Sequence, residues 1–271
     1  MKFYTDFKSA FVFARSGKTF KDVAKIFGIF ILSFFRNRSP LRLRSIFDLP
    51  VRGLTLETDV KFRIRTVFDF FVFSNVWERE LADFFEWEKG MTFLDVGAHI
   101  GRYTIRAGVK VGDKGKVVAI EANPDNYNLL LENIKLNLIQ NCIPLNIAAF
   151  AYDTELELFI GADSAKNSVK EDSGKGYCVV QARALDNVLA EAGITHVNLI
   201  KIDVEGAEYA VLQGLANTLR AGSPRVMVEV LTQDAHQIIQ YMNNLSYREK
   251  LLHYSSDYKE GIAYYSFEKE K

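Results

Sequence analysis

The 271-residue sequence predicts a doubly wound α/β fold with a mostly parallel, seven-stranded sheet. Three observations support this class. Beyond Gly90, short apolar segments alternate with amphipathic helical segments, a glycine-containing turn joins the first apolar segment to a helix, and the last two strand-like segments follow one another without a helix between them. Alternation of nearly continuous apolar strands with helices is typical of a parallel sheet that helices cover on both faces.

The core elements can be placed from this alternation. Strands are expected at Thr92–Val96, Lys116–Glu121, Ile143–Ala149, Leu199–Asp203 and Arg225–Leu231. The intervening helices are expected to include Tyr127–Leu138, Tyr209–Arg220 and Ala235–Asn243.

Two pairs of predicted strands do not follow this alternation of strands and helices. Lys250–Tyr254 and Ile262–Phe267 are joined by a loop too short for a helical crossover, so we expect an antiparallel pair. A mostly parallel sheet closed by a terminal hairpin is the layout of methyltransferases, and plain dinucleotide-binding domains lack it. Glu155–Ile160 and Tyr177–Arg183 predict a second strand pair that flanks a polar loop.

The segments before the core are expected to enter the same domain. Alternation within Thr55–Phe73 predicts one or two strands, and the spacing of apolar residues in Trp77–Trp87 predicts a helix. Pro50 marks a boundary, so we expect a leader over residues 1–50 and one domain over residues 51–271.

The leader is basic and amphipathic. Residues 1–50 carry a net charge of +7, so the other 221 residues carry −7, although the whole chain is neutral. Apolar residues recur at helical spacing from Phe20 to Phe35, which predicts a helix with a wide phenylalanine-rich face. Such a helix can lie peripherally in a membrane interface through residues 20–38, or it can pack on protein, and both interpretations stay open.

Composition and short motifs limit the class of protein and its cellular location. A hydrophobic fraction of 48% and a charged fraction of 25% are typical of a globular chain. The apolar run Ile26–Phe35 is too short to cross a bilayer, which needs ~20 residues, and no cleavage pattern follows it. Cys142 and Cys178 lack metal-ligand spacing, and with two cysteines a disulfide framework is disfavoured. A cytoplasmic location, peripheral at the membrane if the leader binds lipid, fits these features, and homo-oligomerisation is an open option.

A first motif runs from Phe93 to Gly101, where a strand ends in Asp95 and a turn with Gly97 opens a helix. Ligands of open α/β sheets bind at the carboxyl ends of such strands, and glycine lets the backbone approach closely. A dinucleotide fingerprint starting at Gly97 would need glycine where His99 and Arg102 stand, so pyrophosphate binding is disfavoured. S-adenosylmethionine carries no phosphate and does not need a glycine-rich turn that binds pyrophosphate.

A second motif is Glu121, at the end of the next strand. Its carboxylate can accept hydrogen bonds from both ribose hydroxyls of an adenosine, and the alternative is a solvated strand-end acid. Pro124 follows close behind, as expected in the first turn of a helix.

A third motif, Ile200–Glu208, places acids and a lysine at the mouth of the fourth core strand. Alternation should send Lys201 and Asp203 to the same side. Methyl transfer to an alcohol needs a base for the hydroxyl proton, and a positioned carboxylate such as Asp203 or Glu205 can serve. Glu208 is better explained as an acid at the start of the next helix, where the helix dipole favours it.

These motifs together resemble the FkbM-type methyltransferase family, over roughly residues 57–231. The matching segments are Asp95–Gly101, Gly115–Pro124, Leu185-Asp186, Ile200–Gly214 and Val228-Glu229-Val230. His99 stands where the family usually has asparagine, and Ala122 stands where proline is usual. The leader has no counterpart in the family.

The resemblance implies a class I, Rossmann-like methyltransferase domain that uses S-adenosyl-L-methionine, with no assignable metal. The predicted catalytic set is Asp203, Glu205 and Lys201. The predicted cofactor-binding residues are Asp95, Gly97, Ala98, His99, Gly101, Glu121, Ala122, Asn123, Ala149 and Asp203.

The expected reaction is O-methylation of a hydroxyl on a carbohydrate, glycolipid or related small-molecule acceptor, and acceptor loops are expected at Gly161–Gly176 and near Phe68–Trp77. Two alternatives stay open. A nucleic-acid methyltransferase is disfavoured because the body is acidic and an Asn/Asp-Pro-Pro-aromatic segment is absent from the sequence. A non-catalytic, membrane-recruited cofactor-binding module is disfavoured because the acids at 95, 121, 203 and 205 are intact.

Overall fold

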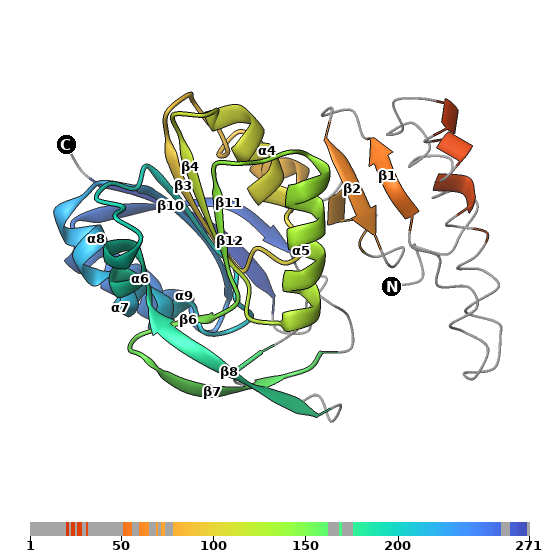
Figure 1. Ribbon diagram of the computed structural model, residues 1–271. Helices are drawn as coiled ribbons and strands as arrows, with labels where there is room; N and C mark the ends of the chain where they lie inside the picture. The colour runs from red at the N-terminus through yellow and green to blue at the C-terminus, as the bar shows by residue number, and fades with distance from the viewer. Residues whose placement is uncertain are drawn as a thin grey trace. The chain divides into compact units, whose positions relative to one another are not determined.

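The computed structural model of the chain divides into two compact units, each described here by itself (Figure 1). The first contains residues 1–79 and 129–139, and the second contains residues 80–128 and 140–271. The structure describes residues 20, 21, 23, 24, 26–28, 31, 51–55, 60–64, 69, 72, 73, 78–161, 168, 169, 176–255 and 261–269.

The second unit is built on a seven-stranded sheet with the order β11-β12-β10-β9-β3-β4-β5. Its strands are β3 (Thr92–Val96), β4 (Lys116–Ile120), β5 (Cys142–Leu145), β9 (Leu199–Ile202), β10 (Arg225–Leu231), β11 (Tyr247–Ser255) and β12 (Ile262–Lys269). Neighbouring strands from β10 to β5 are parallel, whereas β12 is antiparallel to both β10 and β11. The predicted fold class and the terminal antiparallel pair are therefore confirmed.

Helices cover both faces of this sheet because each core strand is apolar on both sides. The helices are α4 (Arg102–Val111), α5 (Pro124–Leu136), α6 (Leu185–Glu191), α7 (Glu208–Gly214), α8 (Ala216–Ala221) and α9 (Ala235–Asn244). Leu94 and Ile200 face the side where α6 to α9 pack, and the adjacent Phe93 and Leu199 face the side of α4 (Figure 1). This alternation is what a doubly wound sheet requires.

A smaller sheet of order β6-β8-β7 lies beyond β5 in the chain, with β6 at Ala148–Phe150, β7 at Thr154–Phe159 and β8 at Tyr177–Ala184. The antiparallel pairing of β7 with β8 confirms the second predicted strand pair. The prediction of one strand over Ile143–Ala149 was wrong, because β5 and β6 belong to different sheets. Asn146 explains the break: its side-chain amide donates to the carbonyls of Glu121 at 2.8 Å and Ala122 at 3.0 Å, where a longer β5 would have paired.

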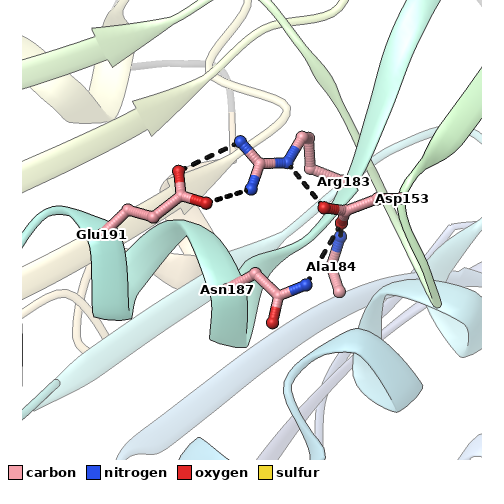
Figure 2. Close-up of polar contacts among 5 residues, drawn as sticks. All are labelled: Asp153, Arg183, Ala184, Asn187 and Glu191. Carbon is pink, nitrogen blue, oxygen red and sulfur yellow. Dashed lines mark hydrogen bonds and ion pairs between the residues drawn. The ribbon is translucent and has the colours of Figure 1, made fainter.

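The small sheet is fastened to α6 by an exposed polar cluster, which Figure 2 shows in close-up. Arg183 donates from Nε to Asp153 at 3.0 Å and from two nitrogens to the carboxylate of Glu191 at 3.1 and 2.5 Å. Asp153 also accepts from the backbone N–H of Ala184, the residue before α6, at 2.8 Å, and from Asn187 at 3.4 Å. The cluster thus fixes where β8 ends and α6 begins.

Two helix predictions were wrong. The expected helix Tyr209–Arg220 is divided into α7 and α8 at Leu215. This break comes directly after Gly214, where a Cβ would lie only 2.0 Å from the carbonyl oxygen of Phe150. In Trp77–Trp87, the described residues 78–87 form a short 3-10 helix, η3 (Arg79–Leu81), followed by turns. Phe85 and Trp87 both pack on Tyr103, and residues two apart cannot share one face of an α-helix.

The first unit contains an antiparallel pair, β1 (Val51–Thr55) and β2 (Lys61–Ile64). Asparagine side chains on α5 and directly after it satisfy the free edge of β2: Asn133 accepts from the N–H of Arg63 at 2.6 Å, and Asn137 accepts from that of Lys61 at 2.7 Å. The strand prediction within Thr55–Phe73 is correct for β2, whereas the described residues 69, 72 and 73 are helical.

The leader prediction is only partly covered by described residues. Residues 20, 21, 23, 24, 26–28 and 31 are helical, in agreement with the predicted helix, and the rest of residues 1–50 lies outside the described part of the chain. Phe20 and Ile31 are exposed, and Ile26 is buried. Among the described helices, none combines the length and the apolar character that crossing a bilayer would demand.

Candidate active site

The sheet has a topological switch point between β3 and β9. From β3 the chain continues to β4 and β5 on one side, and it later returns to place β9 and β10 on the other side. In open α/β sheets, ligands bind at the carboxyl ends of the strands that flank this point. The predicted cofactor turn follows β3 and the predicted catalytic residues follow β9, so the fold brings the two motifs together.

The turn after β3 depends on left-handed backbone. Gly97, His99 and Gly101 have φ values of 79°, 52° and 98°. A Cβ on Gly97 would lie 1.7 Å from the carbonyl oxygen of Asp203, so glycine at this position lets the β3 turn pass directly against the end of β9. Ala98, also in the predicted set, is buried and donates its N–H to the carbonyl of Ile120 at 2.9 Å.

Lys201 links the two turns. Its Nζ donates to the carbonyl of Gly97 at 3.0 Å and lies 3.0 Å from Oδ2 of Asp203 and 3.9 Å from Oδ1 of Asp95. The expectation that Lys201 and Asp203 point to the same side is confirmed. The Lys201 side chain is 4% exposed and that of Asp203 is 25% exposed, so of this pair only the carboxylate reaches solvent.

Asp95 lies below this pair and is fully buried. Its Oδ2 accepts from the hydroxyl of Thr104 at 2.6 Å, and its Oδ1 has no hydrogen-bond partner within the described structure. Burial raises the pKa of Asp95, the neighbouring Lys201 opposes the shift, and Asp203 adds to it. A buried carboxylate oxygen of this kind can accept a hydrogen bond from a ligand donor.

Glu121 follows β4 and forms the second wall of the site. Its carboxylate accepts from the backbone N–H of His99 at 2.7 Å and from that of Asn123 at 2.9 Å. Burial nevertheless raises the pKa of Glu121 to about 7. Because Glu121 is only 7% exposed, it is not a solvated strand-end acid. Asn123 itself caps α5, since its side-chain oxygen accepts from the N–H groups of Asp125 and Asn126.

The turn after Asp203 is unusual in its backbone. Glu205 has a φ of 55° and Gly206 a φ of 107°. Buried Glu208 accepts from the N–H of Gly206 at 2.8 Å and from that of Val204 at 3.4 Å. Glu208 therefore stabilises the turn that opens α7, as the sequence interpretation held.

Two residues near the turn were missed as site residues. Ser168 donates from its hydroxyl to the carbonyl of Glu205 at 2.7 Å. Glu229, on β10, lies level with Asp203, and carboxylate oxygens of the two residues lie within 4.8 Å of each other. An acid near the end of the strand beside β9 was a signal for Glu229. For Ser168, the sequence indicated only that residues 161–176 form an acceptor loop, and it did not indicate the hydrogen bond to Glu205.

The remaining predicted residues lie toward the small sheet. Ala122 packs against the apolar core of that sheet, and Ala149 lies buried in β6. Both residues come after β4 in the chain, as Glu121 does.

Comparison with known proteins identifies this arrangement. Residues 95–249 match the family model described as the methyltransferase FkbM domain. The chain belongs to the FkbM methyltransferase family. Asp95, the Lys201–Asp203 pair and Glu229 all lie within the matched part.

The similar proteins include enzymes with different acceptors. The chain is 28% identical to the hexuronic acid methyltransferase AglP of Haloferax volcanii over 136 residues, which is 50% of this chain and 54% of that protein. It is 27% identical to a probable cobalt-precorrin-6B C(15)-methyltransferase (decarboxylating) of Sulfurisphaera tokodaii, over 46% of this chain and 70% of that protein. The match to AglP thus spans about half of that relative's length.

A solved structure shares the fold. The crystal structure of methyltransferase FkbM from Methylobacillus flagellatus KT superposes with a TM-score of 0.51 at 13% identity, covering 95% of this chain and 58% of that chain. At this identity the likeness shows the Rossmann-like α/β fold alone, and the match to the FkbM methyltransferase domain indicates S-adenosylmethionine as the cofactor.

The residues at the switch point fit this cofactor. The ribose hydroxyls and the ammonium group of S-adenosylmethionine are hydrogen-bond donors, and Glu121 and the free Oδ1 of Asp95 are acceptors. Negative charge also suits the sulfonium cation.

Proposed function

We propose that this enzyme is an O-methyltransferase that acts on a hydroxyl of a carbohydrate, glycolipid or related small-molecule acceptor. One observation carries the proposal: the carboxylate of Asp203 is held by buried Lys201 at the point where β9 ends, and it is still 25% exposed. A fixed, partly exposed carboxylate at the switch point is suited to take a proton from a hydroxyl.

The cofactor side is proposed to lie along the turns after β3 and β4. Glu121 would accept the ribose hydroxyls, and Asp95 would accept from the amino acid end through Oδ1. Bound there, S-adenosylmethionine supplies an electrophilic methyl group. The other residues proposed to line this side are Gly97, Ala98, His99, Gly101, Ala122, Asn123 and Ala149.

On the acceptor side, Asp203 would accept the proton of the acceptor hydroxyl, which would prepare that oxygen to receive the methyl group that the cofactor supplies. Glu205 is the second candidate for this base. Lys201 does not reach the acceptor in this proposal, because its ammonium group is buried; it orients Asp203 and joins the two turns through Gly97. The predicted catalytic role of Lys201 thus becomes one of positioning.

The carbohydrate class of the acceptor is supported by similarity. A relative that is named a hexuronic acid methyltransferase matches half of the chain. The motifs also resemble a family whose members commonly methylate sugar or polyketide hydroxyls.

The proposal is tested with Asp203→Asn and a panel of saccharide acceptors. We expect turnover to fall about 100-fold or more, as for loss of a general base, while the affinity for S-adenosylmethionine changes little. Asp153→Asn, in the exposed cluster between β8 and α6, is the matched control. Unchanged turnover in Asp203→Asn would remove this residue from the mechanism and leave Glu205 as the base.

We also propose that the leader forms a part separate from residues 51–271 and contacts membranes peripherally through residues 20–38. The exposed side chains of Phe20 and Ile31 on one helix support this. Co-sedimentation with anionic vesicles should be lost in the double variant Phe20→Glu, Ile31→Glu. Equal binding by the double variant and the unaltered chain would reject the membrane contact.

A further inference from the structure

Ser168 connects two parts of the enzyme that are far apart in the sequence. Its backbone pairs with Phe159 at the end of β7, through hydrogen bonds of 2.9 and 3.2 Å. Its side-chain hydroxyl donates to the carbonyl of Glu205 at 2.7 Å. One residue therefore joins the small sheet to the turn that carries the proposed base.

The turn needs such support because its backbone is unfavourable. Glu205 has a Cβ and yet adopts a left-handed conformation with φ 55°. Non-glycine residues hold this conformation when the surrounding structure fixes it, and such residues concentrate at functional sites. Glu208 holds the turn from one side by accepting from the N–H groups of Val204 and Gly206. Ser168 holds it from the other side at the carbonyl of Glu205.

We propose that Ser168 is a positioning residue for methyl transfer, which keeps Glu205 and the adjacent Asp203 in the geometry that the reaction needs. The inference rests on the proposed function of these two acids. Ser168 also lies within the segment Gly161–Gly176, where acceptor contacts are expected. The hydrogen bond from Ser168 to the carbonyl of Glu205 supports the turn that carries the base, so Ser168 acts on turnover and leaves cofactor affinity unchanged.

Three variants separate positioning from simple packing. Ser168→Ala removes the hydroxyl and little volume, and Ser168→Thr keeps a hydroxyl. Gln181→Ala is the matched control, because it removes a 2.7 Å hydrogen bond within the same small sheet, from Gln181 on β8 to Glu155 on β7, and leaves the turn after β9 untouched.

The first measurement is hydrogen–deuterium exchange of the peptide that contains residues 203–208, which needs no acceptor. In Ser168→Ala we expect these amides to exchange roughly fivefold faster, the equilibrium equivalent of about one net hydrogen bond. Ser168→Thr should restore slow exchange, and Gln181→Ala should match the unaltered enzyme. The second measurement is steady-state methylation of a saccharide, where Ser168→Ala should lower kcat about tenfold, with KM for S-adenosylmethionine unchanged and partial rescue by threonine.

The two measurements keep this inference distinct from the proposed function. If exchange at residues 203–208 is the same in Ser168→Ala and the unaltered enzyme, the positioning role is overturned, whatever the acceptor. If exchange increases as expected while every saccharide fails as a substrate of the unaltered enzyme, the acceptor class is wrong and the support of the turn by Ser168 stands. Faster exchange with an unchanged kcat on a working acceptor would overturn the role in methyl transfer.

Discussion

Two clusters in this protein each join one basic side chain to two carboxylates, and one cluster is buried whereas the other lies at the surface. Asp95, Lys201 and Asp203 meet at the switch point, where the lysine and Asp95 are buried. Asp153, Arg183 and Glu191 meet on the surface between β8 and α6 (Figure 2). The surface cluster has the more complete hydrogen bonds, since the arginine binds Glu191 with two nitrogens. In the buried cluster, Oδ1 of Asp95 has no hydrogen bond from any residue that the structure describes.

The pKa values of the aspartates in the two clusters shift in opposite directions, and the causes differ. Burial raises the pKa of Asp95, whereas the hydrogen bond from the N–H of Ala184 lowers the pKa of Asp153, and Arg183 lowers it further. Exposed charged groups with all of their hydrogen bonds made are typical of structural contacts. Buried charged groups that lack some of their hydrogen bonds are typical of functional sites. The better-bonded cluster is therefore the structural one, and the incompletely bonded cluster is the candidate active site.

Removing the cation from each cluster should give the largest difference. Lys201→Met leaves two acids without their counter-ion in a buried site, so we expect a loss of about 3–5 kcal/mol in the free energy of unfolding. Urea denaturation measures this. A midpoint close to that of the unaltered protein would show that Lys201 does not hold the switch point together.

Gly97→Ala tests the close approach of the two turns at the buried cluster. The added Cβ would lie 1.7 Å from the carbonyl of Asp203 and would sit on a backbone with φ 79°, so both the clash and the conformation are unfavourable. We expect a loss of about 2 kcal/mol or more and weaker cofactor binding. Gly193→Ala is the control, because it has a similar φ of 65° and open space around its Cβ, and it should cost less.

The raised pKa of Glu121 predicts a pH dependence of cofactor affinity. The ionised carboxylate is the better acceptor for ribose hydroxyls, so affinity for S-adenosylmethionine should rise about tenfold between pH 6 and pH 8 as Glu121 loses its proton near pH 7. Glu121→Gln should bind weakly at both pH values. A slope that persists in Glu121→Gln would assign the titration to another group.

The raised pKa of Glu121 also makes the free energy of unfolding depend on pH. Because the folded-state pKa lies above the ordinary value of 4.5, the native chain retains a proton that the unfolded chain has lost between these values. The contribution of Glu121 to stability is therefore complete below pH 4.5 and declines as the pH rises through about 7. Thermal unfolding of Glu121→Gln should lack this part of the pH dependence.

The smallest effect is expected in the surface cluster. Arg183→Met removes exposed ion pairs that water and salt already screen, so the midpoint of urea unfolding should stay near that of the unaltered protein and methylation should continue. A large loss of activity in Arg183→Met would contradict the assignment of this cluster to structure.

Local patterns were sufficient for much of the fold. Nearly continuous apolar runs located β3, β4, β9 and β10, and the short link after β11 predicted the antiparallel end of the sheet. Period-two alternation placed Lys201 and Asp203 on one side, as their 3.0 Å contact confirms.

The errors came from tertiary contacts that a local pattern does not contain. Asn146 follows β5 and binds carbonyls that follow β4, and Gly214, the last residue of α7, lies against the carbonyl of Phe150. Ser168 reaches Glu205 across 37 residues through a side-chain hydroxyl that has many other uses in a loop. These contacts determine where the elements end and how the site is supported. They join residues that are far apart in the sequence, so local sequence patterns do not predict them.

The central claim is that the cofactor binds at the switch point. Calorimetric titration with S-adenosylmethionine of the unaltered chain, Glu121→Ala and Asp153→Ala tests it most directly. We expect micromolar binding to the unaltered chain and to Asp153→Ala, with binding lost in Glu121→Ala. Equal binding by Glu121→Ala and the unaltered chain would place the cofactor elsewhere and contradict the claim.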